Sequence, residues 1–454
     1  MYKRQGISSR SANEDVKCRA EKTFHLPGVI DSMHGWQNFQ SAFFTDMGAI
    51  PNLPQTTVNA IMQDSDGLIW INIANGLFRF DGLHIQLFRP QANQPHSLPD
   101  SIIRTMRPQN SGGFLLGTAT AGVIRFDPKT NYFDPISSDA PTGRGLSIQV
   151  IASDNHNGFW VISDAGIGHL KAGSNSIHYE KKLPFSDKGD IHHITDLLAT
   201  KDNRLWIASN DGLFFRRKEN DVFTALRSSE KEIDTLLTSQ ITALYQDRDD
   251  RLWVGSAFHG GLYMTADGRF YQPKPLKASS PYLNYRSIHG FAELPDNHIW
   301  IATMGGGIID YAFWTAGIKG KLCAPPGEEY TGYVRTWTHN PLNDHSVSGN
   351  NILSLMADRD GGIWIATDRG VSRWNPHPSI AFNLPDILVD KNGMISDSIE
   401  ALLADEKGRI WVGLQNGMIN MIDQQRSQIK KISLKGLQMA QPVRAFLQAK
   451  DGAI

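Results

Sequence analysis

The chain has 454 residues, and its 45 Lys and Arg against 46 Asp and Glu give a formal net charge of −1. This balance argues against a protein that coats nucleic acid, because such binding needs a clustered basic surface. Hydrophobic residues make up 40% of the chain, which is too many for a disordered protein. The two cysteines, Cys18 and Cys323, are too few for a disulfide scaffold or a cysteine-rich metal site, and their pairing stays open.

Taken from the N-terminus, residues 1–40 form a polar segment that we expect to be disordered or partly artefactual. Residues 1–5 are those that the end of a sequencing-library transposon would encode, so we expect the natural start to lie upstream. No window approaches 18 consecutive apolar residues, and residues 1–20 lack the apolar core of a signal peptide. The sequence therefore predicts neither a membrane-spanning helix nor a visible leader.

The first folded unit consists of four short apolar segments joined by turns that contain glycine. Their alternation of apolar and polar residues predicts strands at 58–64, 68–73, 77–80 and 84–88. An antiparallel meander of about 45 residues cannot bury both of its faces alone, so it must stack on similar units. Because a radial stack of four-stranded sheets is a β-propeller, we predict an all-β propeller fold.

This unit recurs along the chain and carries a large apolar residue at one fixed position. Successive spacings are 45, 45, 46, 47, 47, 64 and 47 residues, and the positions are Trp70, Leu115, Trp160, Trp206, Trp253, Trp300, Trp364 and Trp411. Residues with such a period are expected to pack between blades. The first seven predict a seven-bladed propeller at 41–378, and the eighth predicts the first blades of a second, truncated propeller at 379–454. Residues 41–44 and 379–382 resemble each other and are each predicted to form the lead-in strand of a first blade.

An aspartate stands six residues before the tryptophan in five units, at Asp64, Asp154, Asp247, Asp358 and Asp405. The segment 64–67 is similar to the start of an EF-hand loop, but no glutamate follows at the offset that calcium binding needs. Aspartate at the end of a strand commonly caps a turn, and we favour that role. Two units depart from the pattern, with Thr200 and Leu294 at this position.

The segments 58–82, 358–374 and 405–413 resemble the two-component regulator propeller repeat through a shared Asp-x-x-Gly-x-x-Trp core. The linkers at 93–98 and 340–347 are similar to the Ser-Leu loop that precedes a repeat in that family. The resemblance covers residues 41–454 and implies extracytoplasmic propellers, commonly two seven-bladed rings in tandem. It further implies a homodimer in the periplasm, held by a membrane helix that follows the propellers. A histidine kinase, with its phosphorelay, or a diguanylate cyclase would then carry the output.

The turns between the second and third strands of a propeller open on one face around the channel, where binding sites are commonly placed. Here they carry hydroxyl, amide, aromatic and charged residues, including Phe258, His259, Asp368 and Arg369. This mixture suits a polar ligand such as a glycan. The alternative is a solvated rim, because turns prefer the same residue types.

The 64-residue spacing before Trp364 indicates an insertion between Phe313 and Asn350. Long loops in compact folds are often functional, and aromatic residues stack well on sugars. We expect Tyr333 and Trp337 in this loop to contact a ligand or a second protomer, with a simple flap as the alternative. The loop also contains Trp314, Cys323, Glu328, Glu329 and Tyr330.

Catalytic signatures such as Gly-x-Ser-x-Gly, His-Glu-x-x-His, a P-loop and a dinucleotide-binding loop are absent from the sequence. His192 and His193 fall on a predicted strand, where adjacent side chains point to opposite faces and cannot share a metal. We therefore expect no catalytic residue, metal or cofactor.

The leading hypothesis is a ligand-sensing module that binds a small molecule or an oligosaccharide, binds no nucleic acid and is not itself an enzyme. One alternative is a propeller enzyme, either a glycoside hydrolase acting on polysaccharide or a lyase. Another is a scaffold that binds only proteins.

Overall fold

The computed structural model describes residues 44–47, 53, 56–110, 112–140, 146–180, 193–218, 221–272, 287–295, 297–312, 333–341, 343, 345–375, 398–423, 428–432, 441–449 and 451–454. The chain divides into two compact units. One comprises residues 40–314 and 324–389, and the other comprises residues 1–39, 315–323 and 390–454. The domain limits expected from the sequence, 41–378 and 379–454, stay predictions.

The larger unit contains seven sheets among its described residues, and in each the strands that follow one another in sequence pair antiparallel. The first three sheets are formed by β2 (Val58–Gln63), β3 (Ile69–Ile73), β4 (Gly76–Phe80) and β5 (Ile85–Phe88); by β6 (Ile103–Pro108), β7 (Phe114–Thr118), β8 (Val123–Asp127) and β9 (Tyr132–Pro135); and by β11 (Ile148–Ser153), β12 (Phe159–Ser163), β13 (Gly166–Leu170) and β14 (Ser176–Tyr179), with β10 (Ser137–Ser138) parallel to β14.

The other four sheets of this unit follow in chain order. They are formed by β15 (Ile194–Ala199), β16 (Leu205–Ser209), β17 (Gly212–Arg216) and β18 (Thr224–Ala225); by β19 (Ile241–Gln246), β20 (Leu252–Ser256), β21 (Gly261–Met264) and β22 (Phe270–Tyr271); by β23 (Ile288–Glu293), β24 (His298–Thr303), β25 (Gly307–Ala312) and β26 (Tyr333–Trp337); and by β27 (Ile352–Ala357), β28 (Ile363–Thr367), β29 (Gly370–Trp374) and β1 (Phe44–Asp46).

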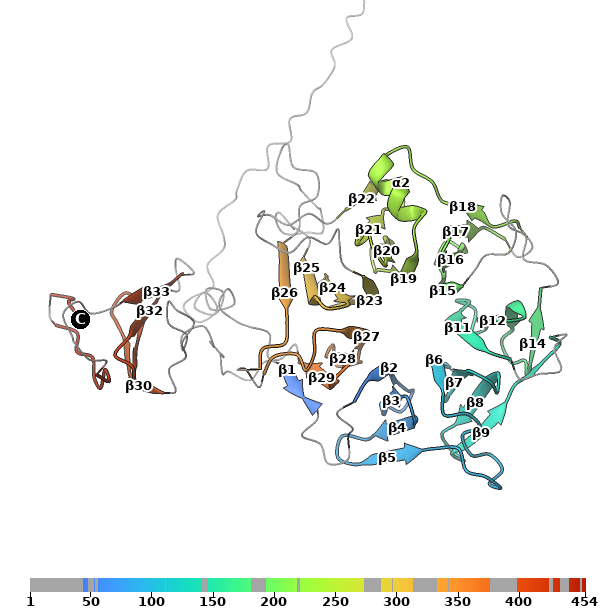
Figure 1. The fold of residues 1–454 in the computed structure, drawn as a ribbon, viewed down its shortest axis with the longest axis horizontal. Coiled ribbons are helices and arrows are strands. Elements are labelled where there is room, and N and C mark those ends of the chain that lie inside the picture. Colours follow the sequence, from blue (N-terminus) through green and yellow to red (C-terminus); the bar gives the residue numbers. More distant parts are fainter. Residues whose placement is uncertain are drawn as a thin grey trace, which may run out of the picture. The chain divides into compact units, whose positions relative to one another are not determined.

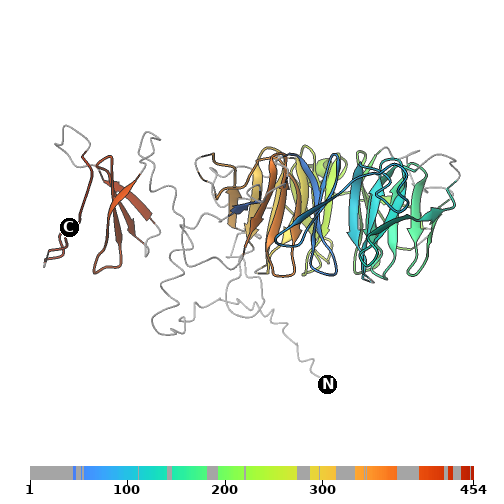
Figure 2. The same cartoon turned by 90° about the horizontal axis from the view of Figure 1, so that it is seen from below.

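These sheets stand side by side in a ring, with the first strand of each nearest the centre (Figure 1). Neighbouring first strands contact one another in the order β2, β6, β11, β15, β19, β23 and β27, and β27 contacts β2 again. Figure 2 shows the same sheets edge-on, with their strands running between the two faces of the ring. The all-β propeller predicted from the repeat is therefore confirmed.

The second strand of every sheet in this unit is buried on both sides, as stacking of blades requires. The periodic residues lie on these strands. Trp70 and Leu115 are fully buried, and Trp160, the most exposed of the seven, reaches only 8%. This burial is what packing between blades would require, and that role stays a prediction.

The aspartates cap turns, as expected, and they also hold the tryptophans. Asp64 Oδ1 accepts backbone hydrogen bonds from Asp66 and Leu68, each at 2.9 Å, which closes the turn between β2 and β3. Asp64 Oδ2 accepts a 2.7 Å hydrogen bond from Trp70 Nε1. Each such aspartate therefore ties a turn to the core of its own blade. The same pair recurs at Asp247–Trp253, Asp358–Trp364 and Asp405–Trp411.

The two units that have the tryptophan but lack the aspartate show what the aspartate does. Thr200 Oγ1 substitutes by accepting from Trp206 Nε1 at 3.2 Å. Leu294 offers no acceptor, and the buried Trp300 Nε1 has no hydrogen-bond partner among the described residues. A buried donor without a partner costs roughly 1–3 kcal/mol, so this blade carries a local penalty that its neighbours avoid.

The lead-in strand is placed differently from the prediction. Of residues 41–44, which were expected to begin the first blade, only Phe44 is among the described residues, and it begins β1, which pairs antiparallel with β29 so that Phe44 lies opposite Trp374. The sheet β2–β5 already has four strands, whereas β29 has an edge that only the N-terminal segment covers. Phe44 is buried against Trp300, with ring centroids 5.9 Å apart. The N-terminal strand thus closes the ring on the last sheet. The predicted counterpart at 379–382 lies outside the described residues.

One short helix, α2 (Lys231–Leu237), lies between β18 and β19 and was not predicted. Its buried residues Ile233, Leu236 and Leu237 have helical spacing and join the hydrophobic cluster of Trp206 and Leu252. The helix has only seven residues, so its helical spacing of apolar residues is difficult to distinguish in the sequence from the pattern of the neighbouring strands.

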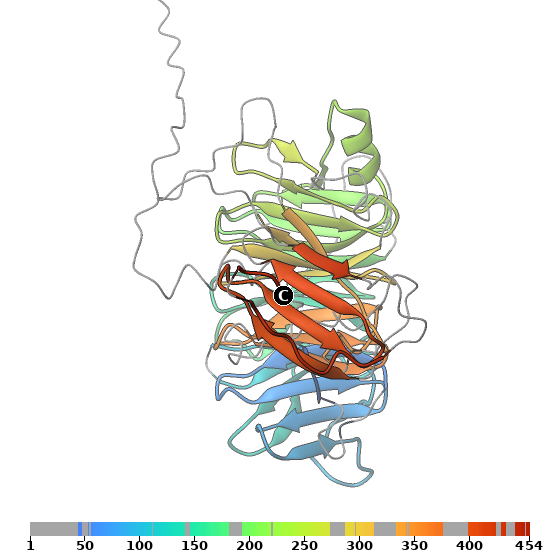
Figure 3. The same ribbon diagram turned by 90° about the vertical axis from the view of Figure 1, so that its left-hand side faces the viewer.

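The smaller unit contains one four-stranded antiparallel sheet among its described residues (Figure 3). Its strands are β30 (Ile399–Ala404), β31 (Ile410–Leu414), β32 (Ile419–Asp423) and β33 (Gln428–Ile432). Trp411 is half-buried here and packs near Phe446, with ring centroids 6.5 Å apart.

Candidate functional site

The turns that the sequence singled out do lie on one face of the ring. In the second to seventh sheets of the ring, this turn is held by a backbone hydrogen bond to the residue just before the first strand of its sheet. Ala257 N donates to Gln240 O at 2.9 Å, and Asp368 N donates to Asn351 O at 3.3 Å. We call this side the turn face.

The predicted ligand residues on the turn face do not form one cluster. Phe258 is 64% exposed, and His259 N donates to Ser256 Oγ at 2.8 Å in the turn between β20 and β21. Asp368 and Arg369 occupy the corresponding turn between β28 and β29, where Asp368 Oδ2 accepts from Asn351 Nδ2 at 2.8 Å. The sheet β23–β26 stands between the two pairs. A ligand role for them stays a prediction.

The insertion was expected to be a loop as far as Asn350, and this is wrong for residues 333–337. Residues Tyr333–Trp337 form β26, which pairs with β25. Trp337 is half-buried and packs edge-on against Phe44, with ring centroids 6.4 Å apart, so its ring serves the core. Residues 313–332, with Trp314, Cys323, Glu328, Glu329 and Tyr330, lie outside the described residues, as does Cys18.

His193 also differs from its prediction as a strand residue. It precedes β15 with a φ of 52°, in the left-handed region, because it turns the chain into the strand. His192 lies outside the described residues.

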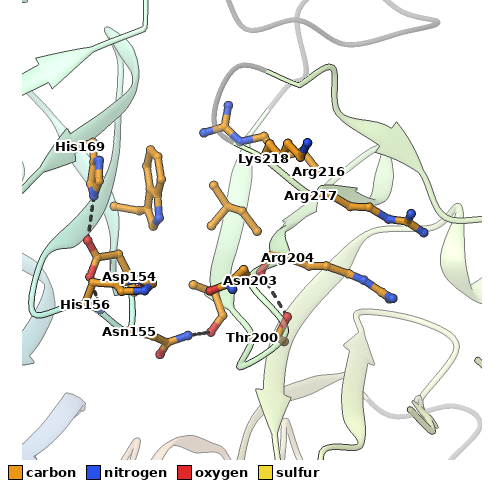
Figure 4. A pocket seen from close by; sticks show the side chains of 13 residues that line it. Asp154, Asn155, His156, His169, Thr200, Asn203, Arg204, Arg216, Arg217 and Lys218 are labelled. Carbon is orange, nitrogen blue, oxygen red and sulfur yellow. Dashed lines mark hydrogen bonds and ion pairs between the residues drawn. The ribbon is translucent and has the colours of Figure 1, made fainter. Parts of the chain in front are cut away.

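A cavity of about 280 Å³ opens between the sheets β11–β14 and β15–β18 (Figure 4). It lies at the turns between first and second strands, around Asp154–His156 and Thr200–Arg204. Successive turns of an antiparallel meander alternate between the two faces, so the cavity opens on the face opposite the turn face. We call it the inter-blade cavity.

Asp154 fixes one wall of the inter-blade cavity. Its Oδ2 lies 2.8 Å from His169 Nε2, and its Oδ1 accepts from the backbone N–H of His156 at 2.7 Å and of Gly158 at 2.8 Å. Burial opposes ionisation of this carboxyl, but the hydrogen bonds from His169 and the turn outweigh it and lower its pKa. Asp154 is thus a satisfied carboxylate.

His169 changes the usual role of this blade's tryptophan. The His169 ring stacks on Trp160, with centroids 4.0 Å apart and planes 12° apart. His169 also contacts the aspartate oxygen to which the indole N–H donates in four other units. Trp160 Nε1 makes no hydrogen bond to any described residue, and Trp160 lines the cavity.

The other wall is cationic. Arg216 is buried and makes two hydrogen bonds to Glu180, at 2.9 and 2.6 Å, while its guanidinium lies 5.1 Å from the Trp160 ring centre. Arg217 and Lys218 follow at the end of β17 and are exposed. Neither has an ion pair with a residue in the described part of the chain.

A second hollow, of about 340 Å³, lies between the sheets β15–β18 and β19–β22 and shares Thr200 and Arg204 with the first. An exposed ion pair, Lys201 Nζ to Asp250 Oδ1 at 2.7 Å, stands beside it. These groups neutralise each other, so this hollow lacks the unbalanced charge of the inter-blade cavity.

Sequence reasoning missed the inter-blade cavity because it considered only the turn face. A signal was nevertheless present in Arg216-Arg217-Lys218, a basic run at the end of a strand. Among the described residues, no three His, Cys, Asp or Glu side chains are grouped as metal ligands would be. No helix in that part of the chain is long and apolar enough to cross a bilayer.

The repeats match the model of the two-component regulator propeller family at residues 52–72, 235–258 and 346–369. No curated protein matches the sequence. Among solved structures, the chain is similar to the extracellular domain of the hybrid two-component system BT3049 from B. thetaiotaomicron, at 18% identity and a TM-score of 0.68. That match covers 91% of this chain and 51% of the other.

Two further structures are similar. The extracellular domain of the hybrid two-component system BT4673 from B. thetaiotaomicron matches at 18% identity and a TM-score of 0.56, over 91% of this chain and 51% of the other. A streptogramin B lyase matches at 14% identity and a TM-score of 0.51, over 73% of this chain and 97% of the lyase. The chain thus spans about half the length of the two extracellular domains.

At these identities the likeness establishes the fold, which is an all-β propeller. The three matched segments lie in three different sheets of the ring, and the resemblance of these repeats to the two-component regulator propeller repeat, predicted from the sequence, is confirmed.

Proposed function

We propose that this chain is the extracytoplasmic ligand-sensing propeller region of a transmembrane signal-transduction protein. The observation that carries the proposal is the family match in three separate blades. The fold shared with extracellular domains of hybrid two-component systems supports the location. Binding would favour one arrangement of propellers or protomers over another, because a ligand shifts an equilibrium only through differential affinity. The output would be a histidine kinase or a diguanylate cyclase.

The proposed ligand is a glycan, and the proposed oligomer is a homodimer of the full-length protein. Polar turns around Phe258 and Asp368, together with the inter-blade cavity, offer hydrogen-bonding surfaces of the kind that sugars need.

Thermal unfolding of the chain in the presence of a panel of neutral and acidic oligosaccharides tests this proposal. At a concentration of about 100 times Kd, a ligand stabilises the native state by about 2.7 kcal/mol, which a thermal shift detects readily. Stabilisation by an oligosaccharide that is recovered intact supports sensing. Recovery of cleaved sugar would instead favour the enzyme alternative, and no shift with any member would refute glycan sensing by this region.

A further inference from the structure

The charges around the inter-blade cavity are unequally paired. Two arginines are neutralised within the protein, whereas the Asp154 carboxylate is hydrogen-bonded but keeps its negative charge. Arg216 is neutralised by Glu180, Asp154 is hydrogen-bonded by His169, and Arg204 Nε lies 3.0 Å from Asp202 Oδ2. Arg217 and Lys218 have no such partner among the described residues, so the mouth of the cavity carries an excess of positive charge.

The indole N–H of Trp160 is the uncharged polar group that distinguishes this cavity, and it is also a hydrogen-bond donor. An indole N–H can only donate, and so can guanidinium and ammonium groups. In four other units the indole N–H donates to the turn aspartate, whereas in this blade the same oxygen lies 2.8 Å from His169 Nε2 and Trp160 Nε1 makes no hydrogen bond to a described residue. Trp160 Nε1, Arg217 and Lys218 therefore line one cavity with donors that lack an acceptor from the described residues.

We propose that the inter-blade cavity binds the acidic group of a saccharide, either the carboxylate of a uronic acid or a sulfate ester. Both groups offer only acceptors and carry negative charge, so they complement Arg217, Lys218 and the Trp160 N–H. The volume of about 280 Å³ lies near the lower limit of ligand pockets, which suits one sugar residue with its acidic group. The inference rests on the proposed glycan-sensing function and names the class of glycan.

Two features of the walls make this an organised site. Arg216 is held by two hydrogen bonds to Glu180 and stacks on Trp160 and Phe223, so it fixes the position from which Arg217 and Lys218 extend. On the opposite wall, stacking on His169 fixes the Trp160 ring. Figure 4 shows Asp154 and His169 on one side and the basic run from Arg216 to Lys218 on the other.

Calorimetric titration of the whole chain with tetragalacturonate, inorganic sulfate and neutral maltotetraose tests the inference. We expect tetragalacturonate or sulfate to bind and maltotetraose not to bind at this cavity. Because exposed cations are screened by salt, the acidic probe should bind several-fold more weakly at about 0.5 M than at about 0.05 M ionic strength.

The variants separate this cavity from general surface charge. The double variant R217A/K218A should weaken binding of the acidic probe about 10-fold or more, because two charge-assisted contacts are lost. The matched control K171A removes an exposed cation from the corresponding turn between β13 and β14, outside the cavity, and should change affinity less than about 2-fold. W160F keeps an aromatic ring but removes the donor, and should weaken binding about 3- to 10-fold.

Unchanged affinity in R217A/K218A, an equal loss in K171A, or equal binding of maltotetraose would each overturn the inference. So would the absence of binding by both acidic probes at about 10 mM, since that excludes even a weak site. Binding of sulfate alone would assign the sulfate ester as the group recognised. Thermal stabilisation by a neutral oligosaccharide, without any effect of acidic probes, would leave glycan sensing intact and remove only this cavity.

Discussion

Replacing Asp247 by alanine should destabilise the ring more than any surface change, because four hydrogen bonds converge on this carboxylate. Its Oδ1 accepts from the backbone N–H groups of Asp249 at 3.1 Å and Arg251 at 2.9 Å. Its Oδ2 accepts from Arg251 Nε at 2.6 Å and Trp253 Nε1 at 2.8 Å. The side chains of Asp247 and Arg251 are 0% and 5% exposed. Removing one partner of a buried ion pair costs about 3–5 kcal/mol, so we expect a loss of about 4 kcal/mol.

Differential scanning calorimetry measures this loss directly. For a unit of about 340 residues that unfolds as one, 4 kcal/mol corresponds to a fall in Tm of about 6 °C. Asp249→Ala is the matched control, because Asp249 is 57% exposed and bonds the same arginine at 2.9 Å. Exposed pairs contribute about 0–1 kcal/mol, so its Tm should fall by about 1 °C at most. Equal shifts in the two variants would show that the convergence of donors on Asp247 is not what stabilises the blade.

Three further outcomes are expected from the same contacts. Trp253→Phe should cost about 1–3 kcal/mol more than Trp300→Phe in urea unfolding, because only the first indole has a carboxylate acceptor; equal costs would contradict this. Phe44→Ala should cost about 3–5 kcal/mol by the same measurement, since the buried ring closes the last sheet; a loss below about 1 kcal/mol would mean that β1 contributes little. Acid should weaken the β30–β33 sheet. Burial raises the pKa of Asp405, but hydrogen bonds from the tryptophan and arginine groups around it outweigh burial and lower its pKa to about 2. Because the pKa is depressed in the folded state, the stabilisation is present above the ordinary value of 3.8 and is lost as pH falls toward 2. Tryptophan fluorescence should report this transition, and its absence in that window would refute the assignment.

Much of the fold could be predicted because one unit is repeated. The spacing from Trp70 onward identified the blades, and in the first of them the structure moves strand limits by no more than one residue. The strand limits could be predicted accurately because the unit is repeated, so a limit misplaced in one blade can be corrected by comparison with the others. Local features without a repeat, such as the helix at 231–237, had no such support.

The closing strand could not be assigned from sequence because strand pairing at an edge depends on which edge is uncovered. Residues 41–44 have a strand-like pattern in either position, and only the three-dimensional ring shows that β29 needs a partner. The same limit applied to Trp337, where an aromatic residue in an insertion looked exposed but packs on Phe44.

The inter-blade cavity illustrates a different limit of prediction from the sequence. Asp154 fitted the repeat, and its role as a turn cap was correct. What the repeat could not indicate was that His169, fifteen positions later on another strand, would contact this oxygen while Trp160 Nε1 makes no hydrogen bond to a described residue. Such an exchange of partners depends on side-chain geometry across a sheet, and a motif of linear spacing does not contain it.

The pairing of β1 with β29 also sets an order of events during synthesis. Phe44 and Trp374 lie about 330 positions apart in the chain, so the ring cannot close until its last sheet is available for pairing. Until then the N-terminal strand has no partner, and the nascent blades present an open edge that could pair with another chain. Changes near residue 44 should therefore lower the yield of folding as well as the stability of the closed ring.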